Sequence, residues 1–259
     1  MPVKLHAATV GRGPHVVLLH GLFGSGNNLG ALARALSARF TVHSVDLPNH
    51  GRSDWLEQAD LASMAACLQA WLVHHGIPSA HCVGHSLGGK VAMQLALAHP
   101  ERVTSLVVAD IAPVTYPPHH DSVFAALDAV AAGRCRSRGE ASELMARHLA
   151  EEAVIQFLLA SLQRGADGVY RWRFNLEGLK ADYRAVRDAP VASGSYPGPV
   201  LFVKGGESDY IRAEHRSHIV ALFPAAQVKI MPGCGHWLHA ERPAQFNGIV
   251  GRFLDGQSG

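Results

Sequence analysis

The chain has 259 residues, of which 48% are hydrophobic and 17% are charged, and its formal net charge is +2. This composition is typical of a globular protein and excludes a disordered chain or a small disulfide-stapled scaffold. The nearly neutral and scattered charge predicts neither a nucleic-acid partner nor an anionic membrane partner.

The first nine residues contain one lysine and no apolar run long enough for a signal peptide, and no later stretch reaches 18 consecutive apolar residues. We therefore expect a cytoplasmic protein without a membrane span. The 17 histidines are dispersed without Cys/His ligand spacing, and we expect no metal and no cofactor. The four cysteines lie far apart without a C-x-x-C pair, which favours reduced thiols at Cys67, Cys82, Cys135 and Cys234.

Short apolar runs alternate along the chain with longer stretches that carry apolar residues at three- and four-residue spacing. The short runs predict strands at residues 15–20, 40–46, 81–84, 103–111, 200–205 and 227–231. The spaced patterns predict helices at residues 29–37, 60–75, 87–99, 213–222 and 243–254. Because the strands are apolar almost throughout, this order predicts an α/β fold with a mostly parallel sheet and helices on both faces.

The alternation stops between residues 113 and 199, where the sequence predicts helical stretches and almost no strand. The predicted helices are residues 122–132, 139–163 and 176–186. The flanking segments APVTYPPHH and APVASGSYPGP are rich in proline and glycine, as loops are. We interpret residues 113–199 as a helical cap inserted into a core of residues 1–112 and 200–259. A lid over a site is favoured over a packing decoration, because the motifs below lie beside its attachment points.

The motif H-G-L-F-G at residues 20–24 ends the first predicted strand. Its glycines permit a close approach to a neighbouring loop. The backbone N–H of Leu22 could then pair with that of Leu87 as an oxyanion hole, with Phe23 as the other possible donor. The alternative is a simple turn at the end of a strand.

The segment D-L-P-N-H-G-R-S at residues 46–53 follows the second predicted strand. Pro48 and Gly51 are typical of a tight turn. We predict a structural role, in which Arg52 or His50 forms hydrogen bonds with the loop near the oxyanion strand, and not a catalytic role for His50.

The strongest signal is G-H-S-L-G-G at residues 84–89, directly after one predicted strand and directly before a helix. It matches the G-x-S-x-G elbow, in which a strained turn exposes the hydroxyl of a nucleophilic serine, here Ser86. The following helix presents free N–H groups to negative charge on a bound carbonyl. The alternative reading is an ordinary helix cap on a glycine-rich turn.

A base and an acid are needed to activate such a serine. His236 lies in the glycine-rich loop M-P-G-C-G-H-W after the last predicted strand, and the chain order serine, acid, histidine fits the elbow. Two carboxylates fit the same order: Asp110 ends a strand, and Asp209 follows another. Either could fix the histidine tautomer and stabilise the imidazolium, so the residues alone leave the acid open.

Together the motifs H-G-L-F-G-S, D-L-P-N-H-G-R-S, G-H-S-L-G-G-K, V-V-A-D-I-A-P-V and G-H-W-L-H-A-E-R-P resemble an α/β-hydrolase over nearly the whole chain. They resemble the YbfF-like acyl-esterase group more than generic family members. This resemblance implies Asp110 as the acid and Ser208 as a residue that supports the histidine. The chain departs from the subgroup by also carrying Asp209, at the position that serves as acid in most other α/β-hydrolases.

The resulting hypothesis is a serine hydrolase that cleaves carboxylic esters or thioesters of short to medium acyl chains through an acyl-enzyme. One alternative is a carbon–carbon bond hydrolase of the dienone type, and another is a non-catalytic relative that binds a ligand. The expected partner is a small acyl ester or thioester, and the oligomeric state stays open. Residues that could line the acyl pocket are Phe23, Trp237, Leu87 and Trp55, with Trp172, Phe174 and Phe157 as its roof. For any one of them taken singly, packing in the core is the favoured alternative.

Overall fold

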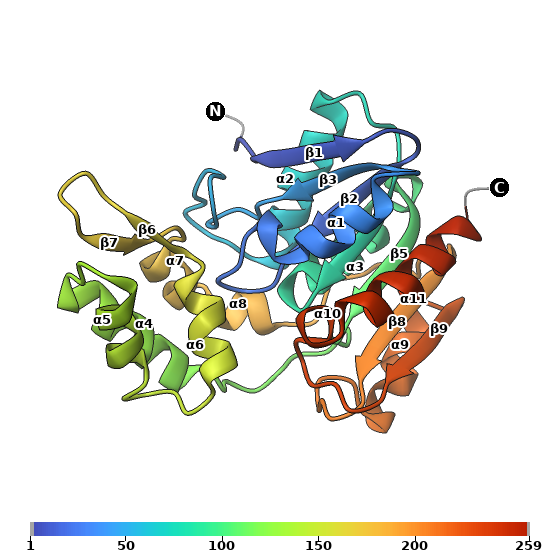
Figure 1. Ribbon diagram of the computed structural model, residues 1–259. Coiled ribbons are helices and arrows are strands. Elements are labelled where there is room, and N and C mark those ends of the chain that lie inside the picture. Colours follow the sequence, from blue (N-terminus) through green and yellow to red (C-terminus); the bar gives the residue numbers. More distant parts are fainter. Residues whose placement is uncertain (1–2, 258–259) are drawn as a thin grey trace.

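The structure is a computed structural model that describes residues 3–257. A seven-stranded sheet forms the centre of the molecule (Figure 1). The strand order is β1-β3-β2-β4-β5-β8-β9. The strands are β1 (Ala7–Gly11), β2 (His15–Leu19), β3 (Thr41–Val45), β4 (Ala80–His85), β5 (Val103–Ala109), β8 (Val200–Gly205) and β9 (Ala226–Met231). All neighbouring pairs are parallel except β1 with β3, so the predicted mostly parallel sheet is confirmed.

Strand β1 is an antiparallel edge that the sequence pattern did not predict. Its register places Ala7 opposite Val45 and Gly11 opposite Thr41. Four of its five residues are exposed, and Val10 is the only large apolar residue it contains. Strand prediction from buried apolar runs therefore has no signal to detect at this edge.

Helices cover both faces of the sheet. One face carries α1 (Gly30–Leu36) and α11 (Pro243–Asp255), and the other carries α2 (Leu61–His74), α3 (Leu87–Ala98) and α9 (Arg216–Leu222) (Figure 1). Short helices η1 (Gly26–Leu29), η2 (Pro100–Arg102), η3 (Ala213–His215) and α10 (Leu238–Glu241) complete the core. In β2, Val16 and Leu18 pack into one face, whereas Val17 and Leu19 pack into the other. Such two-sided burial explains why these strands read as continuous apolar runs.

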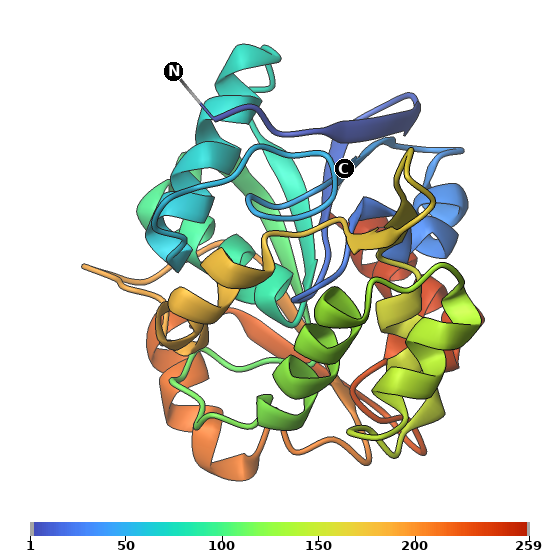
Figure 2. The same ribbon diagram turned by 90° about the vertical axis from the view of Figure 1, so that its left-hand side faces the viewer.

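A separate group of elements is inserted between β5 and β8 (Figure 2). It comprises α4 (Asp121–Gly133), α5 (Arg138–Met145), α6 (Glu152–Leu159), β6 (Leu162–Arg164), β7 (Tyr170–Trp172), α7 (Leu176–Ala181) and α8 (Tyr183–Arg187). Most of its buried side chains form a hydrophobic cluster distinct from the two that line the sheet. All of these elements lie within residues 113–199, the segment that we interpreted from the sequence as a cap.

The helical stretch expected at residues 139–163 is wrong in detail, because the chain forms two short helices and then the first strand of a hairpin. Arg138 donates hydrogen bonds to the carbonyls of Leu159 and Leu162, at 2.5 and 3.1 Å, and so satisfies acceptors where α6 ends. Gly168, with φ at 78°, makes the turn between β6 and β7. Arg138 therefore supports the change of direction after α6 through contacts distant in sequence, which local periodicity does not reveal.

The insertion is fastened to the core near both of its ends by side chains of α3. Lys90 is buried and donates hydrogen bonds to the carbonyls of Val114, Arg187 and Asp188, at 2.9, 2.5 and 2.7 Å. One turn further along α3, Gln94 exchanges two hydrogen bonds with the backbone of Val191. Segments that enter and leave the insertion are thus held on one helix.

No helix within residues 3–257 combines the length and the apolar character that crossing a bilayer requires.

Candidate active site

Ser86 occupies the sharp turn between β4 and α3, with φ 53° and ψ −119°. A side chain at Gly84 would place its Cβ 2.2 Å from the Gly88 carbonyl oxygen, and one at Gly88 would lie 2.3 Å from the Leu19 carbonyl oxygen. Glycine is therefore required at both positions. The Ser86 backbone N–H donates to the Ala109 carbonyl at 3.0 Å, which fixes the strained turn against β5.

The loop after β2 passes directly beside this turn. A Cβ at Gly21 would lie 3.3 Å from the Cβ of Ser86. The Phe23 N–H donates to His50 Nε2 at 3.1 Å, so the second candidate donor is already engaged elsewhere. Within the described residues, the N–H groups of Leu22 and Leu87 donate to no other residue. Leu22 and Leu87 therefore remain as the available pair of donors.

His50 and His20 hold the same loop in place by hydrogen bonds. Buried His50 also bonds the Pro48 carbonyl through Nδ1 at 2.9 Å, and burial lowers the pKa of His50 to about 3. His20 bonds the Gly21 carbonyl through Nδ1 and accepts from the Leu47 N–H at Nε2, and burial lowers its pKa. These contacts confirm that His50 bonds the loop near Leu22, as the turn motif predicted.

His236 lies on the loop after β9, and its Nδ1 is 2.8 Å from Oδ2 of Asp110. Asp110 is completely buried, follows β5 with φ 52°, and also accepts hydrogen bonds from the Gly205 N–H at 2.9 Å and from the hydroxyl of Ser208. Three donors thus converge on one carboxylate. They hold it so that Nδ1 of His236 carries a proton and Nε2 is left as the basic nitrogen.

Asp209, the other candidate for the acid, lies on the surface and not beside His236. Its side chain is 89% exposed, and its nearest cationic group is Arg212, 3.8 Å away. Of the two carboxylates that the sequence left open, the structure brings Asp110 to His236 and turns Asp209 toward solvent. The neighbouring Ser208 faces inward instead and reaches Asp110.

Aromatic side chains gather around the imidazole of His236. Tyr210 stacks on it with ring centroids 4.0 Å apart, and its hydroxyl bonds Nε2 of His119 at 2.6 Å. His85 donates from Nε2 to the main-chain carbonyl of His236 at 2.9 Å, and burial lowers the pKa of His85 well below its usual value. Burial likewise lowers the pKa of His120 to about 3. None of the four residues was predicted for the site, since their roles depend on ring contacts between segments far apart in the sequence.

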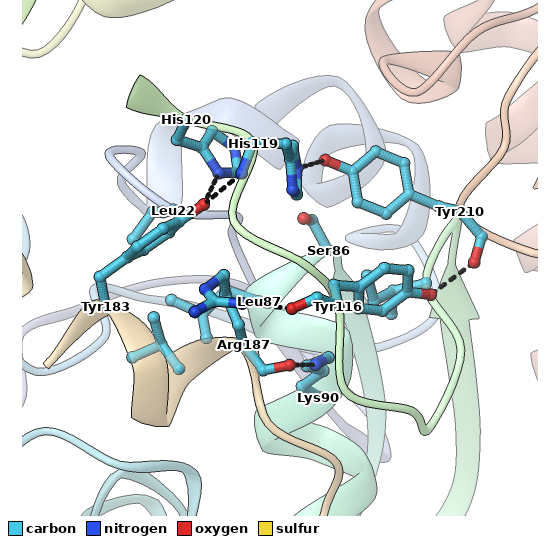
Figure 3. Close-up of a pocket in the computed structure, with 12 residues that line it drawn as sticks. Leu22, Ser86, Leu87, Lys90, Tyr116, His119, His120, Tyr183, Arg187 and Tyr210 are labelled. Carbon is cyan, nitrogen blue, oxygen red and sulfur yellow. Dashed lines mark hydrogen bonds between the residues drawn. The ribbon is translucent and has the colours of Figure 1, made fainter. Parts of the chain in front are cut away.

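Two cavities meet at Ser86. The larger, of about 220 Å³, is lined by His236 and by three predicted pocket residues, Phe23, Phe157 and Trp237. The smaller, of about 50 Å³, is lined by Leu87 and is shown in Figure 3. Ser86 and His236 therefore share a cavity with an apolar wall.

Three aromatic residues expected at the pocket lie elsewhere. Trp55 is 61% exposed and lines a separate surface cavity together with Trp172. Phe174 is buried behind Phe23, with ring centroids 5.2 Å apart, and packs against Trp172. The expectation that Trp55 and Trp172 face the site is wrong, because both line a cavity between hairpin β6–β7 and the loop after β3, which contains neither Ser86 nor His236.

In the part of the chain that the structure describes, no group of three or more His, Cys, Asp or Glu side chains could hold a metal ion.

Comparisons with known proteins find relatives that match nearly the whole chain. A model of the alpha/beta hydrolase family matches residues 16–249. Esterase YbfF of Escherichia coli (strain K12) is 39% identical over 93% of this chain and 92% of its own length. The sn-1-specific diacylglycerol lipase ABHD11 of Mus musculus is 40% identical over 93% of this chain and 81% of its own length. A solved marine microorganism esterase superposes with a TM-score of 0.93 at 34% identity, over 97% of this chain and 99% of its own.

Proposed function

The chain belongs to the alpha/beta hydrolase family and to its YbfF-like esterase subgroup, and from this premise we propose that it cleaves esters or thioesters of short to medium acyl chains. It is an enzyme of the carboxylesterase class. In the proposed reaction Ser86 is the nucleophile, His236 is the general base and acid, and Asp110 orients the imidazole. Asp209 takes no part.

One observation carries the proposal: Ser86, on its strained turn, shares a cavity with His236, whose Nδ1 is held by buried Asp110. In the first step Nε2 of His236 accepts the hydroxyl proton as Oγ of Ser86 bonds to the substrate carbonyl carbon. His236 then returns that proton to the departing alcohol or thiol, and the acyl group stays on Ser86. Water activated by His236 releases the acid and restores the serine.

The negative charge on the tetrahedral intermediate requires donors that are already in place. The N–H groups of Leu22 and Leu87 meet this need, because both flank Ser86 and neither is used by another described residue. The bracing of the Leu22 loop by His50 and His20 keeps one donor fixed before substrate arrives. Such preorganisation is worth about 3–4 kcal/mol of transition-state stabilisation per donor in comparable enzymes.

We propose further that residues 113–199 form a cap over this site. Three of its side chains, Val154, Phe157 and Leu158 of α6, line the cavity that contains Ser86. A cap of this kind supplies apolar contacts for the substrate and limits the access of bulk solvent to the site, while the acyl-enzyme still has to admit the one water molecule that hydrolyses it.

Reaction of the purified protein with a fluorophosphonate probe, beside hydrolysis of p-nitrophenyl acetate, tests the proposal. We expect labelling and turnover in the native protein and a loss of roughly 10⁴- to 10⁶-fold in turnover for Ser86→Ala. Ser193→Ala, in the exposed loop before β8, is the matched control and should change neither. Wild-type turnover in folded Ser86→Ala would overturn the proposal. Cleavage of a vinylogous diketone without cleavage of esters would point to carbon–carbon bond hydrolysis instead.

A further inference from the structure

The two cavities at Ser86 differ in which parts of the reaction machinery they contain. They share Leu22, Ser86, His120 and Tyr210, so the serine lies at their junction. The larger cavity is lined by His236. The smaller is lined by the oxyanion candidate Leu87 and, beyond it, by residues at the two ends of the insertion (Figure 3).

The geometry of acyl transfer decides which group of the substrate each cavity can bind. When Oγ of Ser86 has bonded to the carbonyl carbon, three substituents remain on that carbon: the oxyanion, the leaving group and the acyl chain. The oxyanion points to the N–H groups of Leu22 and Leu87. The leaving atom must point to His236, because the imidazole has to protonate it as the bond breaks. The acyl chain is left with the remaining direction, away from His236.

We propose that the smaller cavity binds the acyl chain and the larger cavity binds the alcohol or thiol leaving group. This assignment rests on the proposed function and narrows it. The volumes are about 50 and 220 Å³, so the acyl side has less than a quarter of the space of the leaving-group side. On this scale a cavity needs about 10–15 Å³ to hold one water molecule, so about 50 Å³ leaves room for a few heavy atoms. The preferred substrates are therefore acetyl to butyryl esters or thioesters of much larger alcohols or thiols.

The wall of the smaller cavity is fixed by hydrogen bonds, so it does not widen by simple side-chain rotation. The Tyr116 hydroxyl accepts from the Ala112 N–H at 2.8 Å and donates to the Tyr210 carbonyl at 2.5 Å. The Tyr183 hydroxyl bonds Nδ1 of His120 at 2.5 Å. Arg187 donates from its guanidinium to the Tyr116 carbonyl. Because hydrogen bonds hold these rings in place, we expect the rate of hydrolysis to fall steeply once the acyl chain is longer than the cavity.

The wall of the larger cavity is built differently. It includes Val123 of α4 together with Val154 and Phe157 of α6, and the Phe157 ring packs on Trp237 with centroids 4.3 Å apart. Apolar packing of this kind lets side chains rearrange around ligands of different shape, whereas a hydrogen-bonded ring has to lose a partner first. The leaving-group side therefore accepts a wide range of lengths.

Two series of esters test the assignment on the purified protein. The first keeps p-nitrophenol as leaving group and lengthens the acyl chain from acetyl to octanoyl. The second keeps the acetyl group and lengthens the alcohol from ethyl to octyl, with acid release followed by pH-stat. We expect kcat/KM to fall at least tenfold beyond butyryl in the first series. In the second it should rise with length, by up to about four-fold for each buried methylene.

A matched pair of variants removes the same two methyl groups from each cavity. Val186 lines the smaller cavity and Val154 the larger. Val186→Ala should move the acyl cut-off one or two carbons longer and leave the shape of the alcohol profile as it was. Val154→Ala should change the alcohol profile and not the acyl cut-off. If Val186→Ala is poorly folded, Val186→Leu provides the opposite test, because it should shorten the cut-off.

The opposite pattern, in which Val186 variants alter the alcohol profile and Val154→Ala alters the acyl cut-off, would overturn the assignment. Equal cut-offs in both series would overturn it as well. If esters of neither series were hydrolysed, the proposed function itself would fail, and this outcome is distinct from an ester hydrolase with the cavities exchanged.

Discussion

At the scale of single residues, Asp110 concentrates most of the polar contacts of the site. It is completely buried and receives hydrogen bonds from His236, Ser208 and the Gly205 N–H. An asparagine there keeps the shape, but its amide cannot hold the imidazole in the same tautomer. We expect Asp110→Asn to lower kcat for p-nitrophenyl acetate by up to about ten-thousand-fold, measured beside circular dichroism to verify folding.

Asp209 supplies the matched control for this change. Its side chain is 89% exposed, and a surface carboxylate of this kind contributes little. Asp209→Asn should therefore change kcat by less than about two-fold. A large loss in Asp209→Asn with a small one in Asp110→Asn would transfer the acid role to Asp209. Comparable losses in both would mean that the two carboxylates share it.

At the scale of elements, the turn between β4 and α3 depends on glycine more than on its serine. A Cβ at Gly84 would lie 2.2 Å from the Gly88 carbonyl oxygen, whereas a Cβ at Gly194, before β8, meets nothing within 4 Å. We expect Gly84→Ala to destabilise the fold by about 1–3 kcal/mol, or to displace the turn. Either result lowers the rate of fluorophosphonate labelling. Gly194→Ala should match the native protein in thermal unfolding and in labelling, and equal behaviour of the two variants would contradict the predicted strain.

Helix α3 also carries a titratable group that connects the core with the insertion. Burial lowers the pKa of Lys90 to about 7 from an ordinary 10.5. Between these values the unfolded chain binds more protons at this lysine than the folded protein does. The contribution of Lys90 to stability therefore rises as pH increases from 7 toward 10 and is least favourable below pH 7.

Urea unfolding of the native protein and of Lys90→Met, at several pH values from 7 to 9.5, measures this contribution. The variant removes the donor that three buried carbonyls share, two of which a neutral amine can serve at any one time, and it should be less stable at pH 9 by about 1–3 kcal/mol or more. The difference between the two proteins should grow with pH across the range. Taking the difference removes the opposing effect of buried tyrosines and cysteines, whose pKa values are raised. A difference independent of pH would show that Lys90 stays charged in the folded protein.

At the scale of the whole molecule, the central sheet was predictable because burial on both faces makes its strands continuous apolar runs. The elbow at Ser86 was predictable because a turn that excludes side chains leaves glycines at fixed spacing. The exposed edge strand β1 and the break in residues 139–163 were not predictable, since β1 has no buried apolar run and the chain after α6 is held by Arg138, which is distant in sequence. The positions of Trp55 and Trp172 escaped prediction because aromatic residues near a motif in sequence need not face it in space.

The choice of the catalytic acid shows the same limit of sequence-based prediction at the level of one residue. Asp110 and Asp209 both follow strands whose carboxyl ends meet at one edge of the sheet, and chain order cannot separate them. The direction of each side chain decides, and it follows from a positive φ at Asp110 and from the inward turn of Ser208. Single-residue backbone conformations of this kind leave no periodic signal. The resemblance to a subgroup indicated Asp110, whereas the pattern of the residues alone did not.

The loops that carry Ser86, Asp110 and His236 follow β4, β5 and β9, and the first and last of these residues are 150 positions apart. Contacts of such high sequence separation form slowly, and a growing chain emerges with its N-terminal part first. A nascent polypeptide can therefore order the strand and turn around its serine long before the histidine has been synthesised. Throughout that interval the hydroxyl has no base and stays inert toward acyl compounds around the ribosome. We expect reactivity to arise late, once β9 has paired with β8 and the loop after it has brought His236 to Asp110.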